Sequence, residues 1–227
     1  MAKPVAYNPS EVLAPDFVTV LAPDTGTFAP PPKSGAVKTF KPDNAETYPK
    51  GWSPLGLTSA ETLPSFASDG GDATVLDTAE VAAVRNILGT VTNTFSFVLH
   101  SFNKKVLQMT QGGNDDSTME ESSDEIIQWS GNKRRTVKTS LLFIRADSEM
   151  TVFDYIANAE VAADGRGETS KGALAPIPVK ATILAPTAEQ VTQGAKDAVA
   201  TIIPKKNAAA AGAAAGAAAG APARAGG

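Results

Sequence analysis

The sequence predicts a mainly β fold: an antiparallel β-sandwich or barrel with one flanking α-helix, an extended N-terminal arm and a low-complexity C-terminal tail. Two observations carry this prediction. Nine of the sixteen prolines lie in the first fifty residues, and none lies between Ser65 and Ala175. Within that stretch the apolar residues recur mostly with a period of two, as in a half-buried strand. We place the regular pairing there, because proline removes a backbone donor from a strand.

The strand candidates are defined by their alternation. In Val91–Leu99 the aromatic residues share one face, and Thr136–Arg145 begins in the same way. Leu142 and Ile144 make the other face of the latter apolar too, which predicts cover on both sides. The remaining candidates are Ala79–Leu88, Ile126–Trp129, Thr151–Val161 and Val179–Leu184. Residues 79–88 also fit a helix face, and we favour a strand there.

One helix is expected after the first of these strands. Ser101 is a suitable N-cap residue, and Phe102, Val106 and Met109 follow at helical spacing. Gly112–Gly113 is a typical end of such a helix. About six strands against one helix favour an antiparallel sheet with the helix packed on it.

The composition divides the chain into three parts. We expect residues 1–36 to form the proline-rich arm, residues 37–207 the β-sandwich domain, and residues 208–227 a flexible tail. The tail consists almost entirely of Ala and Gly and repeats the sequence AAAG. Such a segment has no side chains with which to build a core, so we exclude it from the fold.

Composition also limits the function. The chain has no cysteine and one histidine, His100, which excludes disulfides and thiolate chemistry and disfavours zinc sites and imidazole catalysis. The net charge of −4 argues against a protein that coats duplex DNA. No stretch has the length of a signal peptide or membrane span, so we expect synthesis in a cytoplasm. We expect no cofactor and no enzymatic activity.

Three polar segments have a chemical and a plainer interpretation. Gly165–Gly172 superficially suggests a phosphate loop, but Ala173 stands where a Walker motif needs the Lys that follows its second glycine, and we expect a hairpin loop. The acidic segment Asn114–Glu125 lacks the ligand order of an EF-hand, so a solvated loop is favoured over a cation site. The basic cluster Lys133–Arg135 has no accompanying aromatic pattern, so we expect a hairpin turn.

A more specific pattern begins with Gly51-Trp52-Ser53-Pro54-Leu55-Gly56-Leu57-Thr58-Ser59 and continues through Glu61, Leu63, Pro64, Phe66 and Asp69-Gly70-Gly71-Asp72. With it go the segments Phe95–Leu99, Leu107–Met109, Phe153–Ile156 and Ile177–Thr182, in that order. This pattern resembles the major tail tube proteins of long, non-contractile-tailed bacteriophages, especially those that infect actinobacteria. The resemblance covers about Val37–Pro186 and contains no active site.

The resemblance implies a structural virion protein. Six subunits would form a ring whose strands join into one inner barrel, and rings would stack into the tail tube that conducts genomic DNA. It also implies a tape measure protein and tail terminator and tip proteins as partners. By the same analogy we assign the Ser59–Glu80 segment, expected to be a long loop, to ring-to-ring contacts. The residues assigned to this stacking loop are Ser59, Glu61, Leu63, Phe66, Asp69, Gly70, Gly71 and Asp72.

An acidic protein suits such a conduit, because a basic channel would bind the phosphates of DNA. We therefore expect carboxylates in the channel and no lining of lysines. The candidate channel residues are Asp115, Asp116, Glu120 and Glu121. Two other classes remain open: a non-catalytic β-sandwich binding or capsid-decoration module, and a hydrolase that relies on His100 or on a pair of carboxylates.

Overall fold

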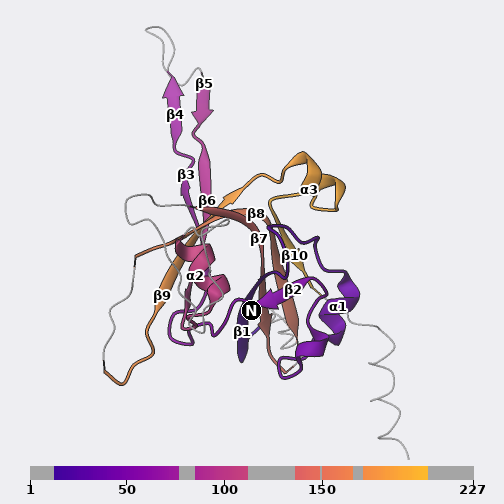
Figure 1. Ribbon diagram of the computed structural model, residues 1–227. Helices are drawn as coiled ribbons and strands as arrows, with labels where there is room; N and C mark the ends of the chain where they lie inside the picture. The colour runs from indigo at the N-terminus through magenta and orange to yellow at the C-terminus, as the bar shows by residue number, and fades with distance from the viewer. Residues whose placement is uncertain (1–12, 77–84, 112–135, 149, 166–170, 204–227) are drawn as a thin grey trace, which may run out of the picture.

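The computed structural model describes residues 13–76, 85–111, 136–148, 150–165 and 171–203. It is mainly β, as the alternation predicted (Figure 1). The strands are β1 (Phe17–Pro23), β2 (Trp52–Pro54), β3 (Ser65–Gly70), β4 (Ala73–Leu76), β5 (Arg85–Leu88), β6 (Val91–Leu99), β7 (Val137–Ala146), β8 (Thr151–Ala163), β9 (Ile177–Leu184) and β10 (Val199–Ile202). The helices are α1 (Ser34–Thr39), α2 (Lys104–Gln111) and α3 (Ala188–Thr192), with a 3-10 turn at Ala45–Thr47.

Eight of these strands form one antiparallel sheet in the order β2-β1-β7-β8-β9-β6-β3, and β10 pairs with β8. The long strand β8 pairs with β10 through its first half and with β9 through its second half. A register shift between β7 and β8 separates these halves: Thr139 opposes Ala159, but Leu141 opposes Ile156. The extra residue in β8 is a β-bulge, which bends the sheet at this point.

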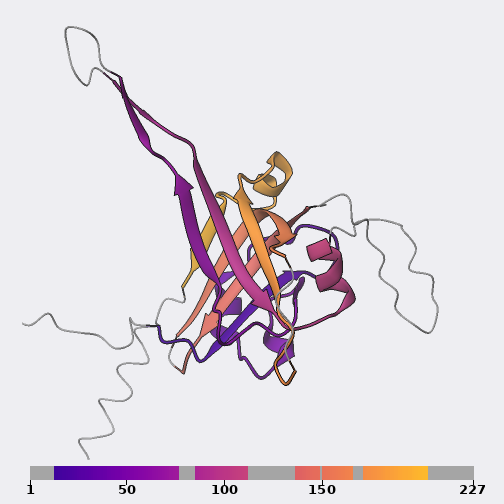
Figure 2. The ribbon, with the colours of Figure 1, turned by 90° about the vertical axis from the view of Figure 1, so that its left-hand side faces the viewer.

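The bent sheet curves back on itself (Figure 2). The residues after β2 connect β1, near one end of the strand order, to β6, near the other end. The Leu55 N–H donates to the Val20 carbonyl at 3.0 Å, next to the last pair of β1 and β2. Further along, Ser59 N–H donates to Val98 O at 2.9 Å, and Thr58 forms a bridge with Leu99. Residues 55–59 therefore bridge from β1 to the end of β6, which gives the sheet the curvature of a barrel.

The interior of this barrel is the main hydrophobic core. It contains the inward-facing residues of β1, β6, β7, β8 and β9 and is covered by α2. As predicted, Phe95, Phe97 and Leu99 share the buried face of β6, and Val106 and Met109 share the buried face of α2. Burying side chains of this size removes roughly 1.5–3 kcal/mol each of unfavourable hydration.

The predicted start of α2 is wrong in detail. The Oδ1 of Asn103 accepts from the Val106 N–H at 2.9 Å, so Asn103 caps the helix. Ser101 instead accepts from the Leu57 N–H through its Oγ, and Phe102 lies before the helix with its ring exposed. The structure also has two short helices beyond the one that we expected. A Thr-x-x-Gln capping box, formed by Thr187 and Gln190, marks the start of α3 in the sequence.

A second apolar cluster covers the outer face of β1, β7 and the first half of β8. Leu142 and Ile144 contribute to it, which confirms the prediction that β7 is covered on both sides. The cover comes from α1 and from Trp52, whose ring meets Tyr155 edge-on at 5.9 Å. Trp52 Nε1 donates to the Pro30 carbonyl at 3.3 Å, so Trp52 also holds the proline-rich segment that contains Pro30 against the sheet.

Part of the segment that we expected to be an extended arm belongs to the sheet. Within residues 1–36, Phe17–Pro23 forms β1, which lies between β2 and β7. Proline does not prevent this, because Pro15 precedes the strand and Pro23 is its last residue. The division into an arm, a domain and a tail stays a prediction, and residues 1–12 and 204–227 lie outside the described residues.

Other predicted elements are confirmed as far as they are described. Arg85–Leu88, the end of the segment with two interpretations, is strand β5. The strands around the glycine-rich segment 165–172 are antiparallel neighbours, as a hairpin connection requires. Residues 77–84, Ile126–Trp129, the acidic segment Asn114–Glu125, the basic cluster Lys133–Arg135 and residues 166–170 lie outside the described residues.

Candidate functional site

A β-ribbon projects from the barrel. The last residues of β3 and the first residues of β6 extend past β9 as an antiparallel pair. This pair continues into β4 and β5, far from the rest of the molecule (Figures 1 and 2). All six residues of β3 are exposed. In the part of the chain that the structure describes, β4 and β5 pair only with each other. The Ser59–Glu80 segment is thus no single long loop, since β3 and β4 occupy half of it.

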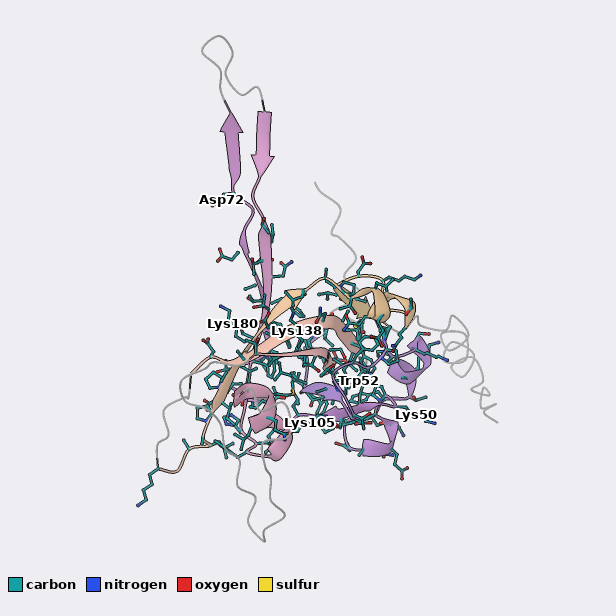
Figure 3. The ribbon with its side chains drawn as sticks, turned by 45° about the horizontal axis from the view of Figure 1, so that its top comes forward. Lys50, Trp52, Asp72, Lys105, Lys138 and Lys180 are labelled. Atoms are coloured by element: carbon teal, nitrogen blue, oxygen red, sulfur yellow. The ribbon has the colours of Figure 1, made fainter. Side chains whose placement is uncertain are left out.

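The Gly-Gly pair forms a bend in this ribbon. Gly70 and Gly71 have φ angles of +89° and +81°, and a Cβ at Gly70 would lie 2.4 Å from the Thr90 carbonyl oxygen. Gly71 N–H donates to Thr90 O at 3.2 Å, and Gly89 N–H donates to Asp72 O at 3.0 Å. Backbone pairing therefore continues through the bend, which contains Asp72 (labelled in Figure 3). We predicted a loop because glycine and aspartate are poor strand residues, but the register with β6 overrides this preference.

The residues assigned to the stacking loop fall in two places. Phe66, Asp69 and Gly70 lie on β3, followed by Gly71 and Asp72 at the bend. Ser59, Glu61 and Leu63 lie instead in the linker before β3. Since Ser59 pairs with Val98, this linker begins at the opposite end of β6 from the ribbon. Phe66 connects β3 to the core through ring contacts with Phe95 at 4.7 Å and Phe143 at 6.4 Å.

The outer face of β3, β6, β9 and the second half of β8 is polar, and no element covers it in the described structure. A row of side chains crosses this face from β7 to β6 and consists of Lys138, Glu160, Thr182 and Thr94, which oppose one another on four neighbouring strands. The polar residues of this face, here called the uncovered polar face, are Ser65, Asp69, Thr92, Thr94, Ser96, Lys138, Glu160, Lys180 and Thr182. All of them are exposed or half-buried.

The charges of the uncovered polar face balance. Lys138 and Lys180 supply two positive charges, and Glu160 and Asp69 supply two negative ones. Figure 3 shows the two lysines beside the base of the ribbon. Glu160 is held by Thr136, whose hydroxyl donates to Oε1 at 2.6 Å. The rest of the face carries mainly hydroxyl groups, so it presents a hydrated surface of low net charge.

Two strand edges bound this face. The outer edge of β3 has no neighbouring strand within the described ranges. On the other side, β1 pairs with β7 only between Leu142 and Ala146, and the Ser140 N–H donates to Thr27 O at 2.9 Å, so within the described ranges only residues 137–139 of β7 have no neighbour on that side. Open edges expose backbone N–H and C=O groups that can pair with another chain.

The sequence reasoning missed two charged groups that stabilise the sheet. Asp154 is 3% exposed, pairs with Arg145 and accepts from the Thr201 hydroxyl at 2.6 Å, which joins β7, β8 and β10. Lys105 Nζ donates to Pro23 O at 2.7 Å and Ser53 Oγ at 2.6 Å. Burial lowers the pKa of the Lys105 ammonium, and the nearby Asp24 carboxylate opposes this shift. Both groups connect strands.

The remaining candidate residues have structural contacts or are not described. The His100 N–H donates to Leu57 O at 2.8 Å, and His100 Nδ1 lies 3.3 Å from Ala175 O, so this histidine contacts two backbone carbonyls. Asp115, Asp116, Glu120 and Glu121 lie outside the described residues. Among the residues that are described, no three metal-ligating side chains come together. None of the described helices has the length and apolar character needed to cross a membrane.

Comparison with known proteins agrees with this architecture. The family model described as "Phage tail tube protein" matches residues 5–205, which includes most of the expected arm. The chain is 28% identical over 183 residues to the major tail protein Gp23 of Mycobacterium phage D29, covering 79% of this chain and 88% of that protein. It is also 28% identical over 185 residues to the major tail protein Gp23 of Mycobacterium phage L5, with the same coverage. The chain therefore belongs to the phage tail tube protein family and is a structural component of the virion tail.

Proposed function

We propose that six copies of this chain form a ring and that the rings stack into a tube through which genomic DNA passes. The uncovered polar face carries this proposal. It is a sheet surface that no described element covers, and it lies between the outer edge of β3 and the first three residues of β7, both open within the described ranges. A face that is hydrophilic and lies between two joining edges suits the inner wall of a ring.

Copies would join through these edges. The open edge of β3 in one copy would lie along the start of β7 in the next, which extends the sheet from subunit to subunit by backbone pairing. This contact is head-to-tail, because it uses different strands of the two copies. Repeated around an axis, such a contact closes a ring, and stacking rings gives an open filament.

The polar face suits a channel for DNA because it has little net charge. Duplex DNA carries about one negative charge per 1.7 Å of its axis, so a surface rich in unpaired lysine would retain it. Here Glu160 lies next to Lys138 in the row across the strands, and Asp69 on the same face balances Lys180. The channel lining proposed here includes carboxylates, as we expected, and their charges balance those of its two lysines.

The ribbon would contact the next ring, as the resemblance implied for this segment. Its extension beyond the body supports this role, as does the fact that β4 and β5 pair with no other described strand. The tape measure protein and the terminator and tip proteins implied by the family complete the proposed set of partners.

Negative-stain electron microscopy of the purified chain tests the ring and the tube. We expect hexameric rings or stacked tubes for the natural sequence. A variant without Asp72–Gly89, in which Gly71 is joined to Thr90, should form rings but no tubes. Gly70 opposes Val91, and Gly71 N–H already donates to Thr90 O, so the shortened ribbon ends in a two-residue turn with a glycine of positive φ.

A charge test addresses the channel. In E160K/T182K the polar face gains three positive charges, and we expect tubes of this variant to retain duplex DNA at low salt and release it as salt increases. A matched variant with three added charges at exposed positions on α3 and directly after it, E189K/Q193K, is the control for total charge. Natural tubes that bind DNA as tightly as the variant, or a monomer under all conditions, would contradict the proposed function.

A further inference from the structure

The structure has an apolar groove that the proposed function leaves without a role. It lies between the start of β1 and the linker from Gly56 to Leu63, with a volume of about 670 Å³. Leu57 and Leu63 are 67% and 50% exposed at its rim, although both are large aliphatic side chains. The other apolar residues that line it are Pro15, Phe17, Val18, Tyr48, Pro54 and Ala60.

The backbone beside this groove is prepared for an additional strand. Pairing between β1 and β2 begins only at Leu21, and Leu55 N–H reaches Val20 O. Residues 17–19 therefore have no strand on their groove side within the described part of the chain, while β7 occupies their other side. An extended segment in the groove could pair with this edge and cover the exposed leucines.

One polar atom also lacks a partner there. Thr58 lines the groove, and its hydroxyl is buried without a hydrogen bond to any described residue. A buried hydroxyl without a partner costs free energy, and a backbone group of an incoming segment would satisfy it.

The groove and the ribbon lie at opposite ends of the same strand. The ribbon continues from Val91, the first residue of β6, whereas Thr58 in the groove forms its bridge with Leu99, the last residue. The nine residues of β6 span about 30 Å. The ribbon points away from the body, so it cannot reach the groove of its own chain (Figure 2).

We propose that this groove receives the β4–β5 ribbon of a second copy, with one ribbon strand pairing with residues 17–19 of β1. The inference rests on the proposed stacking of rings and identifies the surface that accepts the ribbon. β4 and β5 each have one edge without a neighbouring strand in the described structure, and residues 17–19 of β1 have a free edge facing the groove. A ribbon at one end and an acceptor at the other form a head-to-tail contact that repeats without closing, as a filament requires.

Disulfide cross-linking tests this contact cleanly, because the chain has no cysteine. We would place one cysteine at Leu57 or Leu63 and a second at each of residues 73–76 in turn. Since a disulfide needs Cα atoms within about 7 Å, any bond between these sites joins two chains. At least one pair should give a ladder of covalent oligomers on a non-reducing gel. The control pairs L57C with V191C, an exposed position on α3, and should give no ladder.

A charge in the groove gives the second readout. L57D should still form rings but lose tubes, whereas V191D, which places the same charge on another exposed aliphatic residue, should form both. Tubes from L57D, or no cross-link from any groove and ribbon pair while the natural chain forms tubes, would overturn this inference alone. A disulfide within one chain between L57C and V5C would assign the groove to the N-terminal segment and would also overturn it. Failure of the natural chain to form rings or tubes would instead contradict the proposed function.

Discussion

The outer face of the sheet has two halves that share strands β7 and β8 but have opposite properties. Around Tyr155 the face is apolar and covered by α1 and Trp52, and around Glu160 it is polar and uncovered. The bulge between Ile156 and Ala159 separates the two halves. One sheet therefore supplies both the second core of the subunit and the surface proposed for assembly.

The largest expected difference between the halves is in the free energy of unfolding. Phe153 is fully buried in the covered half and meets Phe40 edge-on at 5.6 Å. We expect F153A to lower the free energy of unfolding by about 3–5 kcal/mol, because it removes a large buried side chain and leaves a cavity. Chemical denaturation followed by tryptophan fluorescence measures this loss.

The matched substitution in the polar half is T182A, which should alter the free energy of unfolding by no more than about 0.5 kcal/mol. A loss of several kcal/mol in T182A would show that the polar half is packed against something in the free subunit, and would end the contrast between the halves.

A smaller effect is expected where the covered half holds the proline-rich segment. Ser140 is fully buried, and its Oγ accepts from the Ala29 N–H at 2.9 Å. S140A leaves this buried donor without a partner, so we expect a loss of about 1–3 kcal/mol in the same denaturation experiment. S96A removes a hydroxyl from the uncovered polar face, where water replaces it, so its free energy of unfolding should fall by less than that of S140A. Equal losses would contradict the assignment of Ser140 as a buried acceptor.

The pH dependence of stability tests the covered half without a large cavity. Tyr155 is buried and donates to the Ala29 carbonyl at 3.2 Å, and burial raises the pKa of its hydroxyl above the ordinary value of 10.0. The unfolded chain releases this proton at lower pH than the folded chain does. The stabilisation by the protonated hydroxyl is therefore complete below pH 10 and is lost as the pH rises above that value.

We expect Y155F to be less stable by about 1 kcal/mol at neutral pH, because the hydrogen bond is lost. Between pH 9 and about pH 11 the variant should lose less stability than the natural chain, since it lacks the titrating group. Thermal unfolding across this range measures both. Parallel curves for the two proteins would show that the Tyr155 hydroxyl titrates as it does in the unfolded chain.

The smallest effect is expected for the charged row of the polar half. In E160Q the amide oxygen still accepts from Thr136, so we expect a change of about 0.5 kcal/mol or less in the free energy of unfolding. A clear destabilisation in denaturation experiments would indicate that the charge of Glu160 supports the fold, and would weaken its proposed role as a charge that faces the channel.

Most strands could be predicted because their alternation is local. In Val91–Leu99 the burial of every second residue after Asn93 follows the sequence pattern. The prolines around β1 predict an extended arm, whereas Phe17–Leu21 is rich in β-branched and apolar residues and forms a strand. β3 was missed because Ser68–Gly70 has poor strand propensity, and only pairing with Val91–Asn93 makes it a strand.

The candidate site was less predictable than the fold. The sequence placed Ser59–Asp72 in one contact segment, whereas the structure puts Leu63 in the linker that lines the groove and Asp69 on the ribbon. Their separation depends on which end of β6 each segment pairs with. That register is set by contacts between residues about 20 to 40 positions apart in the chain, and no local pattern encodes it.

The period-two strands from β6 to β9, the position of α2, the absence of cysteine and the resemblance to tail tube proteins follow from residue order and composition alone. Long-range pairing is needed to place β1 inside the sheet, to form the bulge in β8 that divides its outer face, and to put the ribbon and the groove at opposite ends of β6. The physical reason is that alternation specifies the two faces of a strand, whereas pairing between distant strands decides which face is covered.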